Sequence, residues 1–168
     1  MGTNMPWEIP QRKNIRIKGY DYSQAGCYFI TICVQDRHQM LGKVVGANCV
    51  RPCLSEYGNI TENEISVLSN TYDTVKVVKH IVMPNHIHMI ISIVLNEDGR
   101  TQFAPTVSRI IKQFKGSITK QIGFSIWQKS FHDHIIRNDE EYQEIWNYID
   151  TNPQKWTEDC YFVPTPKG

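Results

Sequence analysis

The residues best suited to chemistry are two histidines one residue apart, His86 and His88, in the stretch VMPNHIHMII. The apolar residues around them alternate in the way that predicts a β-strand. Residues two apart on a strand point to the same face, so the two imidazoles should project side by side. Neutral imidazoles at this spacing can share one divalent metal ion. Two hydrogen-bonded, half-exposed histidines at a strand end are the alternative, and the spacing fits both.

A tyrosine on a downstream helix is a second candidate. The sequence predicts a helix that is capped by Asn138, carries Glu141 at the capping-box position and ends at Pro153. The apolar stripe of this helix consists of Tyr142, Ile145, Trp146 and Ile149. Tyr148 lies about 110° from the centre of the stripe, so we expect it to reach a cleft while Tyr142 packs in the core. A surface tyrosine with a half-buried ring is the alternative for Tyr148.

The elements that must position these groups predict a single α+β domain, in which helices pack on a mainly antiparallel sheet. Apolar patterns predict strands or extended segments within residues 27–34, 37–46, 74–84, 86–95 and 124–137. A turn at Pro84 and Asn85 should pair the two strands beside it antiparallel. Two further helices should begin at Ser55 and Thr106. The core face of the histidine strand should consist of Ile87, Met89, Ile91 and Ile93.

The composition fits one domain of 168 residues with a sizeable core, since 40% of the residues are apolar. The net charge of +1 excludes a global basic field, so nucleic-acid binding would need a local basic surface. There is no run of ~18 apolar residues and no apolar signal-peptide core, so we expect a cytoplasmic protein without membrane contact. The odd number of cysteines, five, favours free thiols.

Four stretches together resemble a known family. The strand VMPNHIHMII resembles the His-hydrophobic-His strand of the HUH single-tyrosine transposases, and MPNH is typical of the REP-associated tyrosine transposase branch. CYFITICVQDRHQMLG is similar to the first strand and turn of that family, and SRIIKQFKG is similar to its basic helix. IWQKSFHDHIIRNDEEYQEIWNYIDTNPQKW is similar to its tyrosine-bearing segment. The resemblance covers residues 19–156, with a basic arm at 1–18 before it and a tail at 157–168 after it.

The resemblance implies a ferredoxin/RRM-like HUH fold with a sheet of about 4–5 strands. It implies a metal-dependent transposase that nicks and joins single-stranded DNA beside hairpins. Tyr148 would be the nucleophile and would form a 5′-phosphotyrosine intermediate, without a nucleotide cofactor. The metal would be Mg²⁺ or Mn²⁺, held by His86 and His88. Relatives act as monomers or as homodimers.

The third metal ligand is the open point of this assignment. Asn152 lies four residues after Tyr148, where the family often carries a glutamine. Asn152 could complete the metal site or cap the end of the helix, and Gln154 is a possible substitute. Glu141 could orient a ligand or only complete the capping box. A second His-x-His pair, His132 and His134 (FHDHIIR), could be structural, DNA-contacting or metal-binding.

Local basic surfaces could contact DNA phosphates. One is the predicted helix face that carries Arg109, Lys112, Lys115 and Lys120. The other is the arm that carries Arg12, Lys13 and Arg16. A solvated helix face and a plain tail are the alternatives. Three aromatic residues could stack on unpaired bases or belong to the core, namely Trp127, Phe131 and Trp156.

Two other functions fit the same residues. A catalytically inactive DNA-hairpin-binding protein could retain the fold without the chemistry. A metal-dependent phosphodiesterase could use activated water in place of Tyr148.

Overall fold

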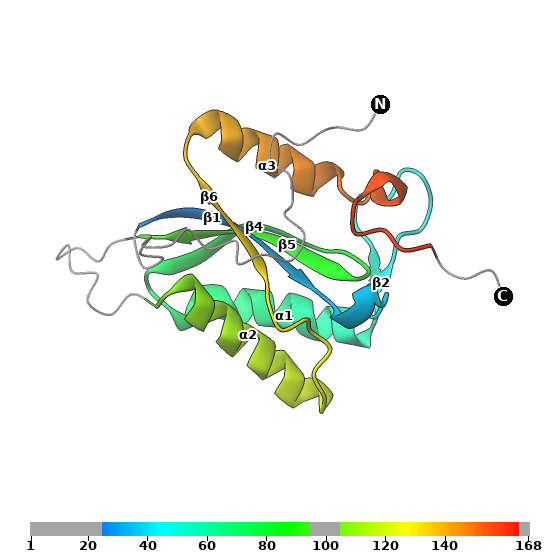
Figure 1. Cartoon of the computed structure of the whole chain (residues 1–168), viewed down its shortest axis with the longest axis horizontal. Coiled ribbons are helices and arrows are strands. Elements are labelled where there is room, and N and C mark those ends of the chain that lie inside the picture. The colour runs from blue at the N-terminus through cyan, green and yellow to red at the C-terminus, as the bar shows by residue number, and fades with distance from the viewer. Residues whose placement is uncertain (1–24, 95–104, 165–168) are drawn as a thin grey trace.

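The strand that carries the histidine pair lies inside a four-stranded antiparallel sheet (Figure 1). The structure is a computed structural model, and it describes residues 25–94 and 105–164. The strand order is β4-β5-β1-β6, so β5 and β1 are central and β6 is an edge strand. The strands are β1 (Gly26–Cys33), β4 (Val75–Val82), β5 (His86–Ile93) and β6 (His132–Ile136). The predicted α+β class and the antiparallel pairing of β4 with β5 are therefore confirmed.

Helices cover both faces of the sheet. Two helices, α1 (Glu56–Thr71) and α2 (Val107–Ile122), lie on one face, and α3 (Asp139–Thr151) lies on the other (Figure 1). Each helix begins where a side chain accepts a hydrogen bond from an orphan backbone N–H, as capping requires. The capping residues are Ser55, Thr106 and Asn138, as predicted.

Short elements lie between the strands of the main sheet and the helices. A two-stranded sheet joins β2 (Gly42–Lys43) to β3 (Cys53–Leu54), and the sequence predicted the first of these strands but not the second. Two single-turn 3₁₀ helices follow β1 and α3, namely η1 (Gln35–Arg37) and η2 (Trp156–Glu158).

The alternation of β5 divides the core into two parts. The predicted apolar residues Ile87, Met89, Ile91 and Ile93 are buried with the apolar stripes of α1 and α2. On the other face, Phe29 and Ile90 pack against Ile145 and Ile149 of α3. His86 and His88 alternate with the first set, so they share the α3 face with the second.

The structure locates the predicted aromatic residues and the cysteines. Trp127 and Trp156 are core residues, and Phe131 packs against the α1–α2 core. All five cysteines are free. The basic arm with Arg12, Lys13 and Arg16 lies outside the described residues. Among the described helices, none is both long and apolar enough to cross a membrane.

Candidate active site

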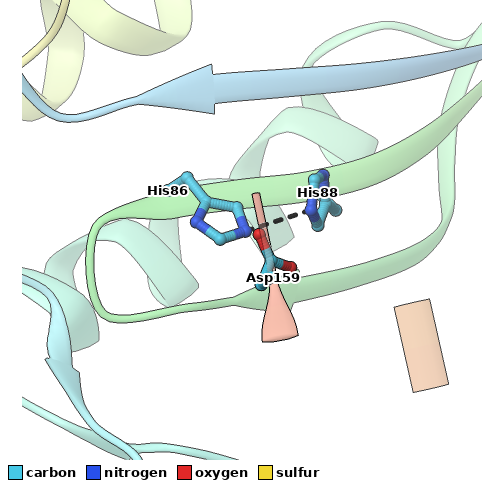
Figure 2. Close-up of side chains that lie close together, drawn as sticks. All are labelled: His86, His88 and Asp159. Atoms are coloured by element: carbon cyan, nitrogen blue, oxygen red, sulfur yellow. Dashed lines mark hydrogen bonds between the residues drawn. The ribbon is translucent and has the colours of Figure 1, made fainter. Parts of the chain in front are cut away.

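The two predicted histidines meet at the start of β5. Their Nε2 atoms lie 3.0 Å apart, and both side chains have 0% of their surface exposed (Figure 2). Burial lowers the pKa of His86 to about 3 and is also the main cause of the lowered pKa of His88. Both imidazoles are therefore neutral at physiological pH, which is the form that binds metal.

Asn85 fixes the orientation of His86. The amide nitrogen of Asn85 donates hydrogen bonds to the carbonyls of Arg37 and Tyr161, at 3.2 and 2.8 Å. Its amide oxygen therefore faces Nδ1 of His86 at 2.8 Å and must accept a proton from it. His86 consequently has its lone pair on Nε2, directed at His88. On the other ring, Nδ1 of His88 lies 2.8 Å from the hydroxyl of Thr31, which can accept in the same way.

A carboxylate from beyond α3 faces the two rings. Asp159 offers an oxygen within 4.8 Å of a nitrogen of each histidine, and it points toward them from the segment after η2 (Figure 2). Its other contacts hold it there: it accepts from the backbone N–H of Tyr161 at 2.7 Å. Sequence reasoning missed Asp159, because it lies in an irregular tail where no periodicity says which way a side chain points.

Asn152, the predicted third ligand, lies beside this cluster. It is buried at the end of α3, and its amide nitrogen donates to Asp159 at 2.5 Å. Its amide oxygen is buried and has no hydrogen-bond partner among the described residues. The arrangement leaves Asn152 free to hold Asp159 in place, to offer that oxygen to an ion, or to do both. Gln154, the substitute candidate, is exposed.

Tyr148 reaches the histidine pair. Its hydroxyl lies 3.3 Å from Nε2 of His88 and donates to a carboxylate oxygen of Asp159 at 3.3 Å. The ring meets Phe29 edge-on, at 6.2 Å between centroids. Burial, followed by the charge of Asp159, raises the pKa of Tyr148 well above its ordinary value. Tyr142 lies beside Trp146, with 5.9 Å between the ring centroids, and is only partly buried at the edge of the core, so the predicted core position of Tyr142 is wrong.

The residues present fit a divalent cation. Two nitrogens 3.0 Å apart match ligands at right angles around an ion with bonds of ~2.1 Å, as in octahedral coordination. The donor set of two imidazoles and a carboxylate suits several divalent ions. Without an ion, the Nε2 atom of His86 accepts a hydrogen bond from Nε2 of His88, and a bound cation would take the place of that proton.

The two histidines of the second pair, His132 and His134, have different neighbours. His134 contacts Glu141 at 2.5 Å, and Glu141 also accepts from the backbone N–H of Arg137 at 2.7 Å. Glu141 therefore ties β6 to the start of α3 and does not complete the metal cluster. His132 pairs with Thr31 across the sheet, and Thr31 pairs with His88, so all three lie in one row.

The basic residues of α2 lie away from this cluster. The side chains of Arg109, Lys112 and Lys120 are exposed on the helix that covers the opposite face of the sheet (Figure 1). The ammonium group of Lys115 donates to the carbonyls of Gln128 and Ser130, at 2.8 and 2.9 Å. Burial lowers the pKa of Lys115 to about 8. A DNA strand would have to pass around the sheet edge to touch both α2 and the histidines.

The fold matches a known class of protein. A solved structure of a REP-associated tyrosine transposase bound to a REP hairpin superposes with a TM-score of 0.63. The match covers 86% of this chain and 76% of that chain at 22% sequence identity, so it establishes the shared fold. The single α+β domain is thus the fold of that transposase.

Sequence relatives point in the same direction. No family profile matches the chain. A protein of Haemophilus influenzae without an assigned function is 29% identical over 92% of this chain and 95% of its own length. A second H. influenzae protein, provisionally named a REP-associated tyrosine transposase, is 28% identical over 80% of this chain and 74% of its own length. The REP-associated tyrosine transposase of Escherichia coli is 36% identical over 45% of this chain and 42% of its own length. These relatives confirm the predicted resemblance: the chain is similar in sequence to REP-associated tyrosine transposases, and the names of these relatives support a transposase enzyme.

Proposed function

We propose that this protein is a divalent-metal-dependent enzyme that nicks and rejoins single-stranded DNA, with Tyr148 as the nucleophile. One observation carries the proposal. The hydroxyl of Tyr148 lies 3.3 Å both from His88 and from Asp159, two members of the candidate metal cluster. A nucleophile in that position would attack a phosphate held at the cluster.

His86, His88 and Asp159 would hold the ion, which we expect to be Mg²⁺ or Mn²⁺, with Asn152 as a further donor or as support for Asp159. A bound divalent cation supplies positive charge that polarises the phosphate and stabilises the charge that develops on it. The raised pKa of Tyr148 keeps the phenol protonated in the protein alone, so the nucleophile is latent until substrate and cation are present.

The proposed reaction exchanges one phosphate ester for another. A bond forms between the phenolic oxygen of Tyr148 and phosphorus, and the bond from phosphorus to the 3′ oxygen breaks. Tyr148 releases one proton, and the 3′ oxygen takes up one proton as it leaves as a hydroxyl, so the number of protons is unchanged. Asp159 already accepts the hydrogen bond of that phenol, so it is placed to take the proton. The 5′-phosphotyrosine conserves the ester energy for rejoining, so no nucleotide cofactor is needed.

The DNA partner that we propose is a hairpin with single-stranded flanks. The structurally similar transposase is itself bound to a REP hairpin, which supports this class of DNA. Arg109, Lys112 and Lys120 would contact phosphates away from the cleavage site, and the arm with Arg12, Lys13 and Arg16 would add to them. We propose residues 19–156 as the main body of the enzyme and the tail after it as the source of Asp159.

A labelling experiment tests this function. The protein is incubated with Mn²⁺ and DNA hairpins labelled at the 3′ end, because a 5′-phosphotyrosine retains the downstream fragment. We expect a protein–DNA adduct that survives denaturation in the wild type and in the matched control Tyr142→Phe. Tyr148→Phe should lose the adduct and retain binding of metal and DNA.

The other outcomes identify the alternatives. Cleavage that persists in Tyr148→Phe would contradict the proposal and favour a phosphodiesterase that uses water. DNA binding without any adduct, across a broad panel of hairpins, would favour an inactive DNA-binding protein of the same fold.

A further inference from the structure

The turn after β1 has an unusual backbone. Asp36 and Arg37, both in η1, have φ values of 55° and 57°. Residues with a Cβ atom avoid this left-handed region because the Cβ approaches a neighbouring carbonyl oxygen. Two such residues in succession persist only where surrounding contacts determine the conformation, and such sites are often functional.

The contacts that fix this turn come from Asn85, the residue before His86 of the candidate metal cluster. The side-chain amide of Asn85 donates to the carbonyl of Arg37 at 3.2 Å, and its oxygen faces His86 at 2.8 Å. The carbonyl of Asn85 accepts from the backbone N–H of Val34 at 2.9 Å, and Arg37 donates its own N–H to Val34 at 3.0 Å. One residue, Asn85, therefore orients a candidate metal ligand and holds the Arg37 backbone.

The guanidinium of Arg37 lies next to Tyr161, whose ring contacts the cluster. Its carbon is 5.7 Å from the centroid of the Tyr161 ring, and that ring stacks on His86 at 4.5 Å. A single aromatic ring, that of Tyr161, thus connects the guanidinium of Arg37 to His86.

Most of the donors of Arg37 are available. The side chain is exposed, and its one described hydrogen bond runs from Nη1 to the carbonyl of Cys160 at 3.2 Å. Within residues 25–94 and 105–164 it forms no salt bridge with a carboxylate. A guanidinium has five N–H donors in a planar fork that matches phosphate oxygens. The exposed basic residues of α2 cannot substitute for it, because they lie on the opposite face of the sheet.

We propose that Arg37 binds a non-bridging oxygen of the DNA phosphodiester at the His86–His88–Asp159 cluster. This inference rests on the proposed function and adds a phosphate-contacting residue to the site. The strained turn would hold the guanidinium beside the ion, where it would bind the substrate phosphate and stabilise the negative charge of the transition state. The alternative is that Arg37 only holds the C-terminal segment through Cys160 and Tyr161.

The salt dependence of DNA binding separates these two roles. Each phosphate contact on single-stranded DNA contributes about 0.7 to the slope of log affinity against log salt concentration. Hairpin DNA with single-stranded flanks is titrated in a Tyr148→Phe background, which prevents turnover. Arg37→Gln and Arg37→Met should each reduce the slope by about 0.7, whereas Arg37→Lys keeps the charge and should keep the slope. The control Lys76→Gln replaces an exposed lysine of β4 that pairs with Ser92, six residues along β5 from His86, and should leave the slope unchanged.

Adduct formation is measured in the same variants with Tyr148 intact. We expect Arg37→Gln and Arg37→Met to slow adduct formation about 100-fold and Lys76→Gln to have no effect. An unchanged salt slope in Arg37→Gln and Arg37→Met would overturn the inference, even with slower adduct formation, because it would assign Arg37 to the C-terminal segment. A wild type that forms no adduct, combined with a reduced slope in Arg37→Gln, would refute the proposed function and leave the phosphate contact in place.

Discussion

At the scale of single residues, the site depends on two imidazoles kept neutral inside the protein. Burial excludes water from His86 and His88, and the oxygens of Asn85 and Thr31 lie at the Nδ1 atoms of the two rings. Oxygens in these positions are typical of the partners that orient metal-binding histidines. The arrangement favours a metal ion at neutral pH and makes protonation costly.

That cost predicts a pH dependence of folding. The unfolded chain binds a proton at His86 below about pH 6.5, whereas the folded chain does so only near pH 3. Because the unfolded state then binds more protons, the free energy of unfolding falls as the pH falls. We expect a loss of up to ~1.4 kcal/mol per pH unit from this residue between about pH 6 and pH 5 in metal-free buffer.

Urea unfolding across this pH range measures the effect. His38→Gln changes an exposed histidine and should keep the full dependence, while His86→Gln should weaken it. An equal free energy of unfolding of the wild type at about pH 6 and pH 5 would contradict the lowered pKa of the buried imidazoles.

A second residue-scale prediction concerns Asp159. Asp159→Asn keeps the shape of the side chain and removes the charge that faces the two histidines. Loss of partners outside the ligand shell already weakens metal binding by about 10- to 100-fold, so loss of a direct carboxylate should weaken Mn²⁺ binding at least about tenfold. Calorimetric titration with Mn²⁺ measures this change, and Glu158→Gln, at the exposed neighbour, should bind as the wild type does.

An Asp159→Asn protein with wild-type affinity would exclude Asp159 as a ligand. Asn152→Ala would then test the originally predicted third donor, whose amide oxygen has no described partner.

At the scale of elements, the position of α1 depends on one close approach. A Cβ atom at Gly58 would lie 1.9 Å from the carbonyl oxygen of Leu41 and 3.1 Å from Cβ of Leu54. Gly58 therefore lets the first turn of α1 pack against the segment that leads into β2. By contrast, a Cβ atom at Gly116 in α2 would meet no atom within 4 Å.

These two glycines form a matched pair. We expect Gly58→Ala to lower the free energy of unfolding by about 1–3 kcal/mol or more, because rigid backbone must shift to admit the methyl group. Gly116→Ala should raise it by about 0.5–1 kcal/mol, since alanine favours a helix interior. Denaturant titration of both variants measures the difference, and a neutral Gly58→Ala would contradict the packing at Leu41.

The sequence was informative where a repeating pattern exists. Alternation along β5 separated the histidines from the core residues, and the helical period placed Tyr148 apart from Tyr142. Local capping chemistry identified Asn138 as the start of α3. The structure bears out the alternation of β5 and the start of α3, whereas Tyr142 and Tyr148 are both partly buried beside the α3 core.

The features that the sequence did not predict arise from long-range contacts. Asp159 reaches the histidines through an irregular tail, β3 has two residues, and the turn at Arg37 is fixed by Asn85. None of these has a periodic signal, because each depends on how distant segments meet. Glu141 is another example. Its carboxylate accepts from the backbone N–H of Arg137, whereas a capping box would have it accept from that of the capping residue Asn138.

At the scale of the whole molecule, the two faces of the sheet have different surroundings. The candidate metal cluster lies between the sheet and the α3 side, beside the rings of Trp156 and Tyr161. The exposed basic residues of α2 lie on the other side (Figure 1). Because the two histidines are fully buried, the segment that carries Tyr161 must move before a phosphate can reach them. In the proposed function, DNA contacts made by α2 and cleavage at the histidines would therefore use different parts of the surface.

The central claim is that Tyr148 forms the covalent bond to DNA, and mapping that bond tests it most directly. The adduct formed with Mn²⁺ is digested with nuclease and trypsin, and the peptide 138–155, which contains both Tyr142 and Tyr148, is sequenced by fragmentation mass spectrometry. We predict a nucleotide phosphate on Tyr148 and an unmodified Tyr142. A phosphate on any other residue, or an adduct that forms without Tyr148, would contradict it.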